Sequence, residues 1–307
     1  MNHLAKIIFF GNERLATGVT TTAPTLQALI SAGYNVVAVV SHFEQANSRK
    51  SRGLEIASVA KEHNIPLLLP HKPAEITDQL KAYGAEVGVL VAYGKIVPQT
   101  IIDIFPKGII NIHPSALPKH RGPTPIESII LSGETSTAVS VMQLVSAMDA
   151  GPVYVQEQVQ LTGQESKQEL SDKLLAIGGK LVLDVLPKVL TGSIEPTQQD
   201  DTQATFDKLL QKQDGLIDWT KPAQQIEREV RAYAQWPKSH TRFKDLDVVI
   251  TQARVVEQNE KAGKVVVRDK ELIVYCGKDA LVIDKLKPAG KPQMDASEFI
   301  NGYKKYL

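Results

Sequence analysis

An amide and an imidazole stand two residues apart in the segment from Ile109 to Gly122. Asn111 and His113 follow a short apolar run, and at strand spacing their side chains point to the same side. Pro114 argues against continuation of the strand beyond this point. We therefore expect a hydrogen-bond donor for a developing oxyanion and a titratable base together at the carboxyl end of a strand, where open α/β sheets bind ligands.

A carboxylate in a later loop is the third candidate. Asp149 follows the apolar run of residues 139–144, and Gly151 and Pro152 come directly behind it. A carboxylate in such a loop can reach across to an imidazole. The sequence thus predicts that Asn111, His113 and Asp149 converge.

Short apolar runs alternate with amphipathic stretches in the first part of the chain. This alternation is typical of βαβ units and predicts an α/β, Rossmann-like fold, a mostly parallel sheet with helices on both faces. We expect strands at residues 6–10, 36–40, 66–69, 87–92, 108–112, 138–144 and 153–161. We expect helices at residues 23–31, 53–63, 76–83, 125–132 and 167–190.

A polar stretch with few apolar side chains predicts a domain boundary. We expect residues 191–207 to link a first, catalytic domain at 1–190 to a second domain at 208–307. In the second domain we expect a helix at 223–231 and strands at 247–250, 253–256, 264–267, 271–275 and 280–286. Such a series of short strands predicts a small, OB-like β-barrel of the kind that binds nucleic acid.

The two parts of the chain differ in charge. Residues 1–207 carry 16 basic and 20 acidic side chains, whereas residues 208–307 carry 19 and 14. The basic surplus of the second part favours contact with a polyanion, although a solvated surface would show the same surplus.

The composition is that of an ordinary globular protein. The chain has 307 residues, 43% of them hydrophobic and 22% charged. No apolar run approaches the roughly 20 residues that cross a bilayer, and the first residues lack a signal-peptide pattern, so we expect a cytoplasmic protein. We expect the single cysteine, Cys276, to be a buried side chain.

Nucleotide and metal signatures are missing from the sequence. The first βα turn, residues 11–18, places Glu13 where a pyrophosphate would need small residues. His113 and His120 are seven residues apart with prolines between them, a poor spacing for a shared metal. We expect no metal site.

Several segments resemble the methionyl-tRNA formyltransferases, a group within the folate-dependent formyltransferase family. The matching segments span nearly the whole chain and lie at residues 91–98, 111–122, 148–152, 217–219, 231–237, 288–294 and 299–302. The Asn-x-His pair and the distant Asp are shared by such enzymes generally, whereas the closing Pro-Ala-Gly-Lys block and a basic loop favour the enzyme that acts on tRNA.

The resemblance implies formyl transfer from 10-formyltetrahydrofolate, a consumed cosubstrate, to the amino group of initiator methionyl-tRNA. Asn111 would stabilise the oxyanion, and Asp149 would orient His113 and help to remove a proton from the attacking ammonium. The resemblance places the folate along Tyr93, Gly94, Ile96, Ser115, Ala116, Leu117 and Pro118. It implies no tightly bound cofactor.

Basic residues are the candidates for holding the tRNA. Arg49, Lys50 and Arg52 lie where the family's tRNA enzymes insert a basic loop, and Arg231 belongs to the basic second domain. Phosphate contacts of this kind supply affinity without reading sequence. We expect a monomer that does not bind membranes.

The chain departs from the family pattern at Lys119-His120, where an Arg-Trp pair is usual, and at Asn12-Glu13-Arg14 in the first turn. Neither departure touches the three candidate catalytic residues. Three alternatives stay open: a sugar-nucleotide N-formyltransferase that uses the same donor, a folate hydrolase with the same three residues, and an RNA-binding protein without chemistry.

Overall fold

The computed structural model describes residues 5–42 and 54–307. The chain divides into two compact units, each made of three stretches of sequence. The first unit comprises Met1–Pro125, Ser136–Leu161 and Gln168–Lys208, and the second comprises Ile126–Thr135, Thr162–Lys167 and Leu209–Leu307. Residues 191–207 are therefore part of the first unit.

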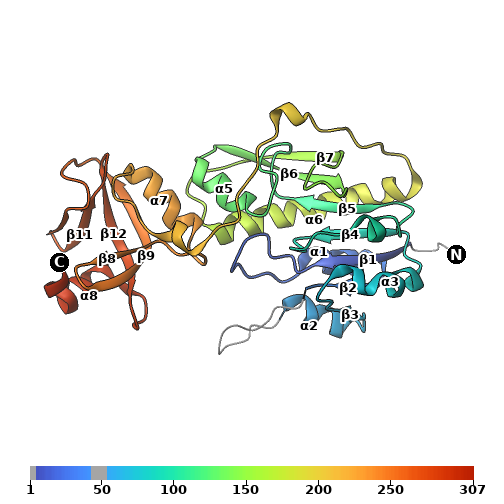
Figure 1. Ribbon diagram of the computed structural model, residues 1–307, viewed down its shortest axis with the longest axis horizontal. Helices are drawn as coiled ribbons and strands as arrows, with labels where there is room; N and C mark the ends of the chain where they lie inside the picture. The colour runs from blue at the N-terminus through green and yellow to red at the C-terminus, as the bar shows by residue number, and fades with distance from the viewer. Residues whose placement is uncertain (1–4, 43–53) are drawn as a thin grey trace. The chain divides into compact units, whose positions relative to one another are not determined.

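A seven-stranded sheet forms the centre of the first unit (Figure 1). Its strands are β1 (Lys6–Gly11), β2 (Asn35–Val40), β3 (Leu67–Leu68), β4 (Val87–Val91), β5 (Ile109–His113), β6 (Ser136–Gln143) and β7 (Val153–Gln160). They lie in the order β3-β2-β1-β4-β5-β6-β7. The first five run parallel, and β6 and β7 are antiparallel additions at one edge. The predicted fold class is confirmed.

Helices pack on both faces of this sheet. They are α1 (Pro24–Ser31), α2 (Glu55–Glu62), α3 (Thr77–Tyr83), which follows the 3-10 turn Pro73–Ile76, α4 (Gln99–Ile102) and α6 (Lys167–Thr191). Gly178 of α6 allows close packing, because a Cβ there would lie 2.5 Å from Ile112 of β5 and 3.3 Å from Val139 of β6. The helix α6 thus covers the face to which Ile112 points.

The opposite face of β5 runs from the core to the carboxyl end of the sheet. Since side chains alternate along a strand, Ile109, Asn111 and His113 share this face. Ile109 lies in a buried cluster with Ile101 of α4 and Leu90 of β4. On this face of β5, the apolar core against α3 and α4 therefore includes Ile109, and the polar side chains of Asn111 and His113 follow it toward the end of the strand.

The second unit is built on an antiparallel sheet in the order β10-β11-β12-β9-β8, with β13 beside β12. Its strands are β8 (His240–Phe243), β9 (Leu246–Val256), β10 (Val265–Arg268), β11 (Glu271–Tyr275), β12 (Ala280–Pro288) and β13 (Met294–Asp295). Its helices are α5 (Pro125–Ser132), which enters it at Ile126, α7 (Ala223–Ala232) and α8 (Ala296–Tyr303). Ile226 of α7 and Phe299 of α8 share one core with strand residues such as Leu281.

Candidate active site

The strand β5 carries Asn111 and His113, each only 5% exposed. Asn111 is held between Leu90 of β4 and Met142 of β6, and His113 pairs with Ser140 of β6. Within the described residues the Asn111 carboxamide has no hydrogen-bond partner, so its donors are available to a bound molecule. The strand β5 ends at His113, so both side chains lie toward its carboxyl end, as the sequence predicts.

Asp149 lies beside His113. The Asp149 Oδ1 atom is 3.7 Å from His113 Nδ1, and both side chains are largely buried. This distance exceeds that of a direct hydrogen bond, about 2.7–3.2 Å. The two side chains are therefore close enough to interact through their charges but do not form a direct hydrogen bond. Asp149 has a φ of 49°, a left-handed conformation that Asp tolerates better than most residues.

The other ring nitrogen of His113 fixes the proton arrangement. Its Nε2 atom is 2.8 Å from the backbone carbonyl of His120. A carbonyl only accepts, so Nε2 must donate, and in the neutral imidazole Nδ1 is left as the basic atom. The basic nitrogen therefore faces Asp149, whose Oδ2 atom accepts a hydrogen bond of 2.8 Å from the Gly122 amide.

The loop after β5 is supported from the neighbouring strands. The Ser140 hydroxyl donates to the Ser115 carbonyl at 2.7 Å and accepts from the Leu117 amide at 3.3 Å. Gln156 of β7 donates to both the Leu117 carbonyl and the Ser140 hydroxyl. Ser140 and Gln156 hold the shape of this loop and were not singled out from the sequence, because their role depends on strand pairing.

The residues expected along the folate differ in exposure. Ile96 is 77% exposed, whereas Tyr93 is 1% exposed, stacks edge-on against Phe10, and has a pKa that burial raises to about 12. The Ser115 side chain is also buried, and its hydroxyl donates to the Lys119 carbonyl. The side chains of Tyr93 and Ser115 therefore pack inside the protein and stabilise the loops that carry them.

The basic candidates fall into two groups. Arg49, Lys50 and Arg52 lie outside the described residues. Arg231 is described, and all three of its guanidinium nitrogens are engaged within the second unit, two with the Glu227 carboxylate and one with the Glu165 carbonyl. A phosphate would have to compete with these bonds for Arg231.

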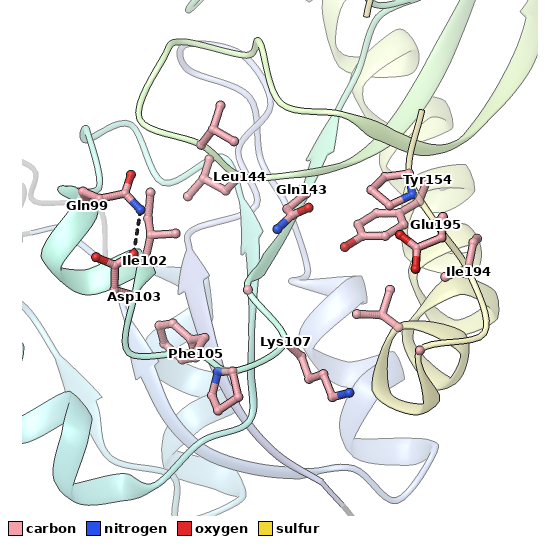
Figure 2. A pocket seen from close by; sticks show the side chains of 16 residues that line it. Gln99, Ile102, Asp103, Phe105, Lys107, Gln143, Leu144, Tyr154, Ile194 and Glu195 are labelled. Carbon is pink, nitrogen blue, oxygen red and sulfur yellow. Dashed lines mark hydrogen bonds between the residues drawn. The ribbon is translucent and has the colours of Figure 1, made fainter. Parts of the chain in front are cut away.

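A pocket of about 560 Å³ opens on the first unit near the amino end of β5 (Figure 2). Tyr154 and Glu195 lie next to each other on one side of it, and a hydrogen bond joins Gln99 to Asp103 on the other. Burial raises the pKa of Tyr154, and the Glu195 charge raises it further. The pocket is lined by Leu144 and Val145 from the loop that leads to Asp149, and by none of the three candidate catalytic side chains.

Two wider searches concern metals and membranes. Across residues 5–42 and 54–307, no group of three or more His, Cys, Asp or Glu side chains is arranged to hold a metal ion. Among the helices of the same residues, none is long and apolar enough to cross a bilayer.

Comparisons with known proteins agree across the chain. Residues 5–186 match the family model described as formyl transferase, and residues 209–304 match that of the formyl transferase C-terminal domain. A methionyl-tRNA formyltransferase of Chloroflexus aggregans is 38% identical over 97% of both chains. One from Trichlorobacter lovleyi is 33% identical over 97% of this chain and 94% of its own.

Solved structures show the same fold at lower identity. An N-formyltransferase from Helicobacter canadensis, in complex with folinic acid and dTDP-3-aminofucose, aligns with 91% of this chain and 97% of its own, at 14% identity and a TM-score of 0.65. HypX from Aquifex aeolicus, in complex with tetrahydrofolic acid, aligns with 98% of this chain at 16% identity and a TM-score of 0.66, and this chain spans 48% of that protein. Since one family model covers more than half of the sequence and curated relatives exceed 30% identity over nearly all of it, this chain belongs to the formyl transferase family.

Proposed function

We propose that this formyltransferase moves a formyl group from 10-formyltetrahydrofolate to the amino group of initiator methionyl-tRNA, with Asn111, His113 and Asp149 as its catalytic residues. The observation that carries the proposal is the meeting of an amide, an imidazole and a carboxylate at the carboxyl end of β5, in a chain whose relatives over 97% of its length are methionyl-tRNA formyltransferases.

The chemistry is acyl transfer. The neutral amine of the methionyl group attacks the formyl carbon, a new C–N bond forms, and the carbonyl electron pair moves to oxygen. The Asn111 amide donates a hydrogen bond to this oxyanion, a contribution of about 3–4 kcal/mol for a preorganised donor. The pair of His113 Nδ1 and Asp149 accepts the ammonium proton. The oxyanion electron pair then re-forms the carbonyl and the bond from the formyl carbon to N10 of the folate breaks. N10 takes up the proton held by the His113–Asp149 pair, which releases tetrahydrofolate and leaves the formylated amine.

The donor lies, in this proposal, along the loop after β4 and the loop after β5. The exposed Ile96 side chain can contact a flat ring system. Gly94 nearby has a φ of 72°, and the His42 ring lies 3.7 Å from where a Cβ of residue 94 would be. The backbone of residues 115–118 is held firmly by Ser140 and Gln156. A rigid loop of this kind can hold the folate so that its formyl carbon lies beside Asn111, His113 and Asp149.

The tRNA is held, in this proposal, by Arg49, Lys50 and Arg52 together with the basic surplus of residues 208–307. Changing all three basic residues to Ala should raise KM for methionyl-tRNA and flatten its dependence on salt, because each lost phosphate contact removes about 0.7–0.9 from the logarithmic salt slope. Steady-state kinetics at several salt concentrations measure this. An unchanged salt slope removes the basic segment from the account.

We also propose that the protein acts as a cytoplasmic monomer. Translation initiation supplies its acceptor there, and size-exclusion chromatography with light scattering measures its mass directly.

One assay separates the proposed function from the alternatives. The protein is mixed with 10-formyltetrahydrofolate and either methionyl initiator tRNA, a 4-amino sugar nucleotide or water alone, and release of tetrahydrofolate is followed. Release that depends on the charged tRNA supports the proposal. Release with the sugar nucleotide, with water, or with none of these contradicts it.

A further inference from the structure

We propose that Gln199 and Asp207 are positioning residues that hold Asp149 and His113 in their working arrangement. Both belong to the strap, which we define as residues 199–207. This stretch reads as a polar linker in sequence, falls between the two family-model matches, and is part of the first unit. The inference rests on the proposed catalytic roles of His113 and Asp149.

Gln199 is joined to the Asp149 loop. Its side-chain NH₂ group donates to the backbone carbonyls of Asp149 at 2.8 Å and Gly151 at 2.7 Å. Its Oε1 atom accepts two hydrogen bonds from the buried Arg121 guanidinium, at 3.1 and 2.8 Å. Both donors and the acceptor of this amide are thus in use. One side chain thereby fixes the loop that presents the Asp149 carboxylate.

Asp207 is joined to the other loop. Its Oδ1 atom accepts from His120 Nδ1 at 3.1 Å, and both side chains are nearly buried. The Thr205 hydroxyl accepts from the His120 amide at 2.8 Å. Two backbone hydrogen bonds also join the strap to the next residue of this loop: the Arg121 amide donates to the Thr205 carbonyl, and the Asp207 amide donates to the Arg121 carbonyl. The His120 carbonyl, held in this way, is the acceptor of the His113 Nε2 proton.

Gly122 shows how closely the strap lies against the site. Its φ is 121°, and a Cβ at this position would lie 2.9 Å from the Asp207 carbonyl oxygen. The same residue donates its amide hydrogen to Asp149 Oδ2. Residues 120–122 therefore contact both the strap and the Asp149 carboxylate. There is no room for a side chain between Gly122 and the strap.

The arrangement has a direct consequence for catalysis. His113 presents Nδ1 to Asp149 only while Nε2 donates to the His120 carbonyl, and Asp149 reaches it only from its left-handed turn. Misplacement of a catalytic group by about 1 Å can cost about 100-fold in rate. Loss of a strap contact should therefore lower kcat, while substrate binding elsewhere stays close to its original strength.

The test uses the full-length protein and three variants. Asp207→Ala removes the acceptor for His120, Asp207→Asn keeps an oxygen at the same place, and Asp200→Ala is the matched control. Asp200 is an exposed acid in the same strap, and among the described residues its carboxylate accepts hydrogen bonds from Thr202 alone. We expect Asp207→Ala to lower kcat by about 10- to 100-fold with little change in either KM, Asp207→Asn to recover most of it, and Asp200→Ala to match the parent.

A double-mutant cycle separates positioning from a general effect on the fold. If Asp207 acts through His113, the Asp207→Ala change should have little further effect on kcat in a His113→Ala background. An equal loss in both backgrounds overturns the proposal, as does an unchanged kcat in Asp207→Ala. Should Asp207→Ala fail to fold, Gln199→Ala carries the same test, because it removes the two bonds to the Asp149 loop and leaves His120 in place.

These outcomes differ from a failure of the proposed function. If the parent protein does not formylate methionyl-tRNA, the proposed function fails whatever the variants do. If the parent is active and the strap variants keep its kcat, the proposed function stands and the positioning role is overturned.

Discussion

At the scale of single residues, the chemistry depends on which nitrogen of His113 is free. Nε2 keeps its proton and donates a hydrogen bond to the His120 carbonyl, so a proton gained during the reaction enters at Nδ1, on the side of Asp149. Catalytic hydrogen bonds that are long without substrate tighten in the substrate complex, so we expect the 3.7 Å separation between His113 Nδ1 and Asp149 Oδ1 to shorten once Nδ1 gains a proton. In the proposed mechanism, His113 and Asp149 thus act as one proton-accepting pair, and Asn111 acts separately on the oxyanion.

Replacing Asn111 tests this division of labour. Asn111→Leu keeps a side chain of similar size on β5 and leaves the backbone pairing with Leu90 and Met142 intact. We expect kcat to fall by about 100- to 1000-fold, the usual loss for one oxyanion donor, with KM for both substrates little changed. The amide of Gln143, on the neighbouring strand, supplies the control variant Gln143→Leu. Equal effects of the two changes would show that Asn111 has no special role.

The candidate catalytic residues could be chosen from sequence because their signals are local. Asn111 and His113 were chosen from strand alternation and a terminating proline, and Asp149 from its loop, in which Gly151 and Pro152 come directly behind it. Gln199, Asp207 and His120 could not be chosen, since their partners lie up to 87 positions away and become neighbours only through the folded chain. Gln199 and Asp207 also lie in the polar stretch that the sequence predicts to be a linker.

At the scale of elements, helix α1 shows a cap supplied from a distance. Ala23 precedes the helix and has no side-chain acceptor, so the amides of Thr25 and Leu26 need another partner. The buried carboxylate of Glu13, in the turn after β1, accepts from both, at 2.9 and 2.8 Å. Burial raises the pKa of Glu13 to about 7, against the lowering effect of these bonds.

Glu13 should make stability depend on pH. Between its unfolded pKa of 4.5 and its folded pKa of about 7, the folded state holds a proton that the unfolded state has lost. The free energy of unfolding should therefore decrease as the pH rises through this range, by up to about 3 kcal/mol. The Glu13→Gln variant keeps one acceptor and cannot titrate, so it should lose this slope. It should be about 1 kcal/mol less stable than the parent near pH 5, where Glu13 is protonated, and this deficit should shrink and then reverse as the pH rises.

Urea unfolding followed by far-UV circular dichroism from pH 5 to pH 8 measures this dependence. Tryptophan fluorescence is unsuitable, because Trp219 and Trp236 both belong to the second unit. The control is Glu62→Gln, an exposed acid at the end of α2. If Glu13→Gln and the control show the same pH slope as the parent, Glu13 does not titrate as proposed.

Element types were more predictable than element partners. Helix 125–132 has the predicted bounds, and the predicted pair of strands 247–250 and 253–256 is wrong in one respect, because β9 runs unbroken from Leu246 to Val256. The predicted break, at residues 251–252, lies opposite the part of β12 where the pairing register shifts, between Ile283 and Leu286. Such an irregularity interrupts the side-chain alternation without ending the strand.

At the scale of the whole molecule, the chain enters the second unit three times. Residues 126–135 and 162–167 join it before the continuous stretch that begins at Leu209. A buried ion pair connects these two earlier segments: Lys167 Nζ is 3.4 Å from Glu127 Oε1, and both side chains are sealed from solvent. Lys167 also donates to the Trp236 carbonyl, next to α7. Burial lowers the pKa of Lys167, and the Glu127 charge opposes this shift.

This pair should govern the stability of the second unit. Lys167→Met removes the ammonium group from beside the buried Glu127 carboxylate, and breaking a buried pair in this way costs about 3–5 kcal/mol. Adding Glu127→Leu removes the second buried charge as well, so the double variant should recover most of the loss. Urea unfolding followed by tryptophan fluorescence reports the second unit directly, since it holds both tryptophans.

Lys173→Met is the matched control, because Lys173 lies on the same helix α6, is exposed and bonds to the Gln160 carbonyl of the first unit. Its fluorescence transition should match that of the parent. The decisive comparison is between the single and double variants at positions 167 and 127. Removing one partner of a buried ion pair destabilises a protein far more than the pair contributes, so recovery in the double variant is expected from the electrostatics alone. If the double variant is no more stable than Lys167→Met, the loss comes from packing around α6, and the ion pair does not organise the three segments of the second unit.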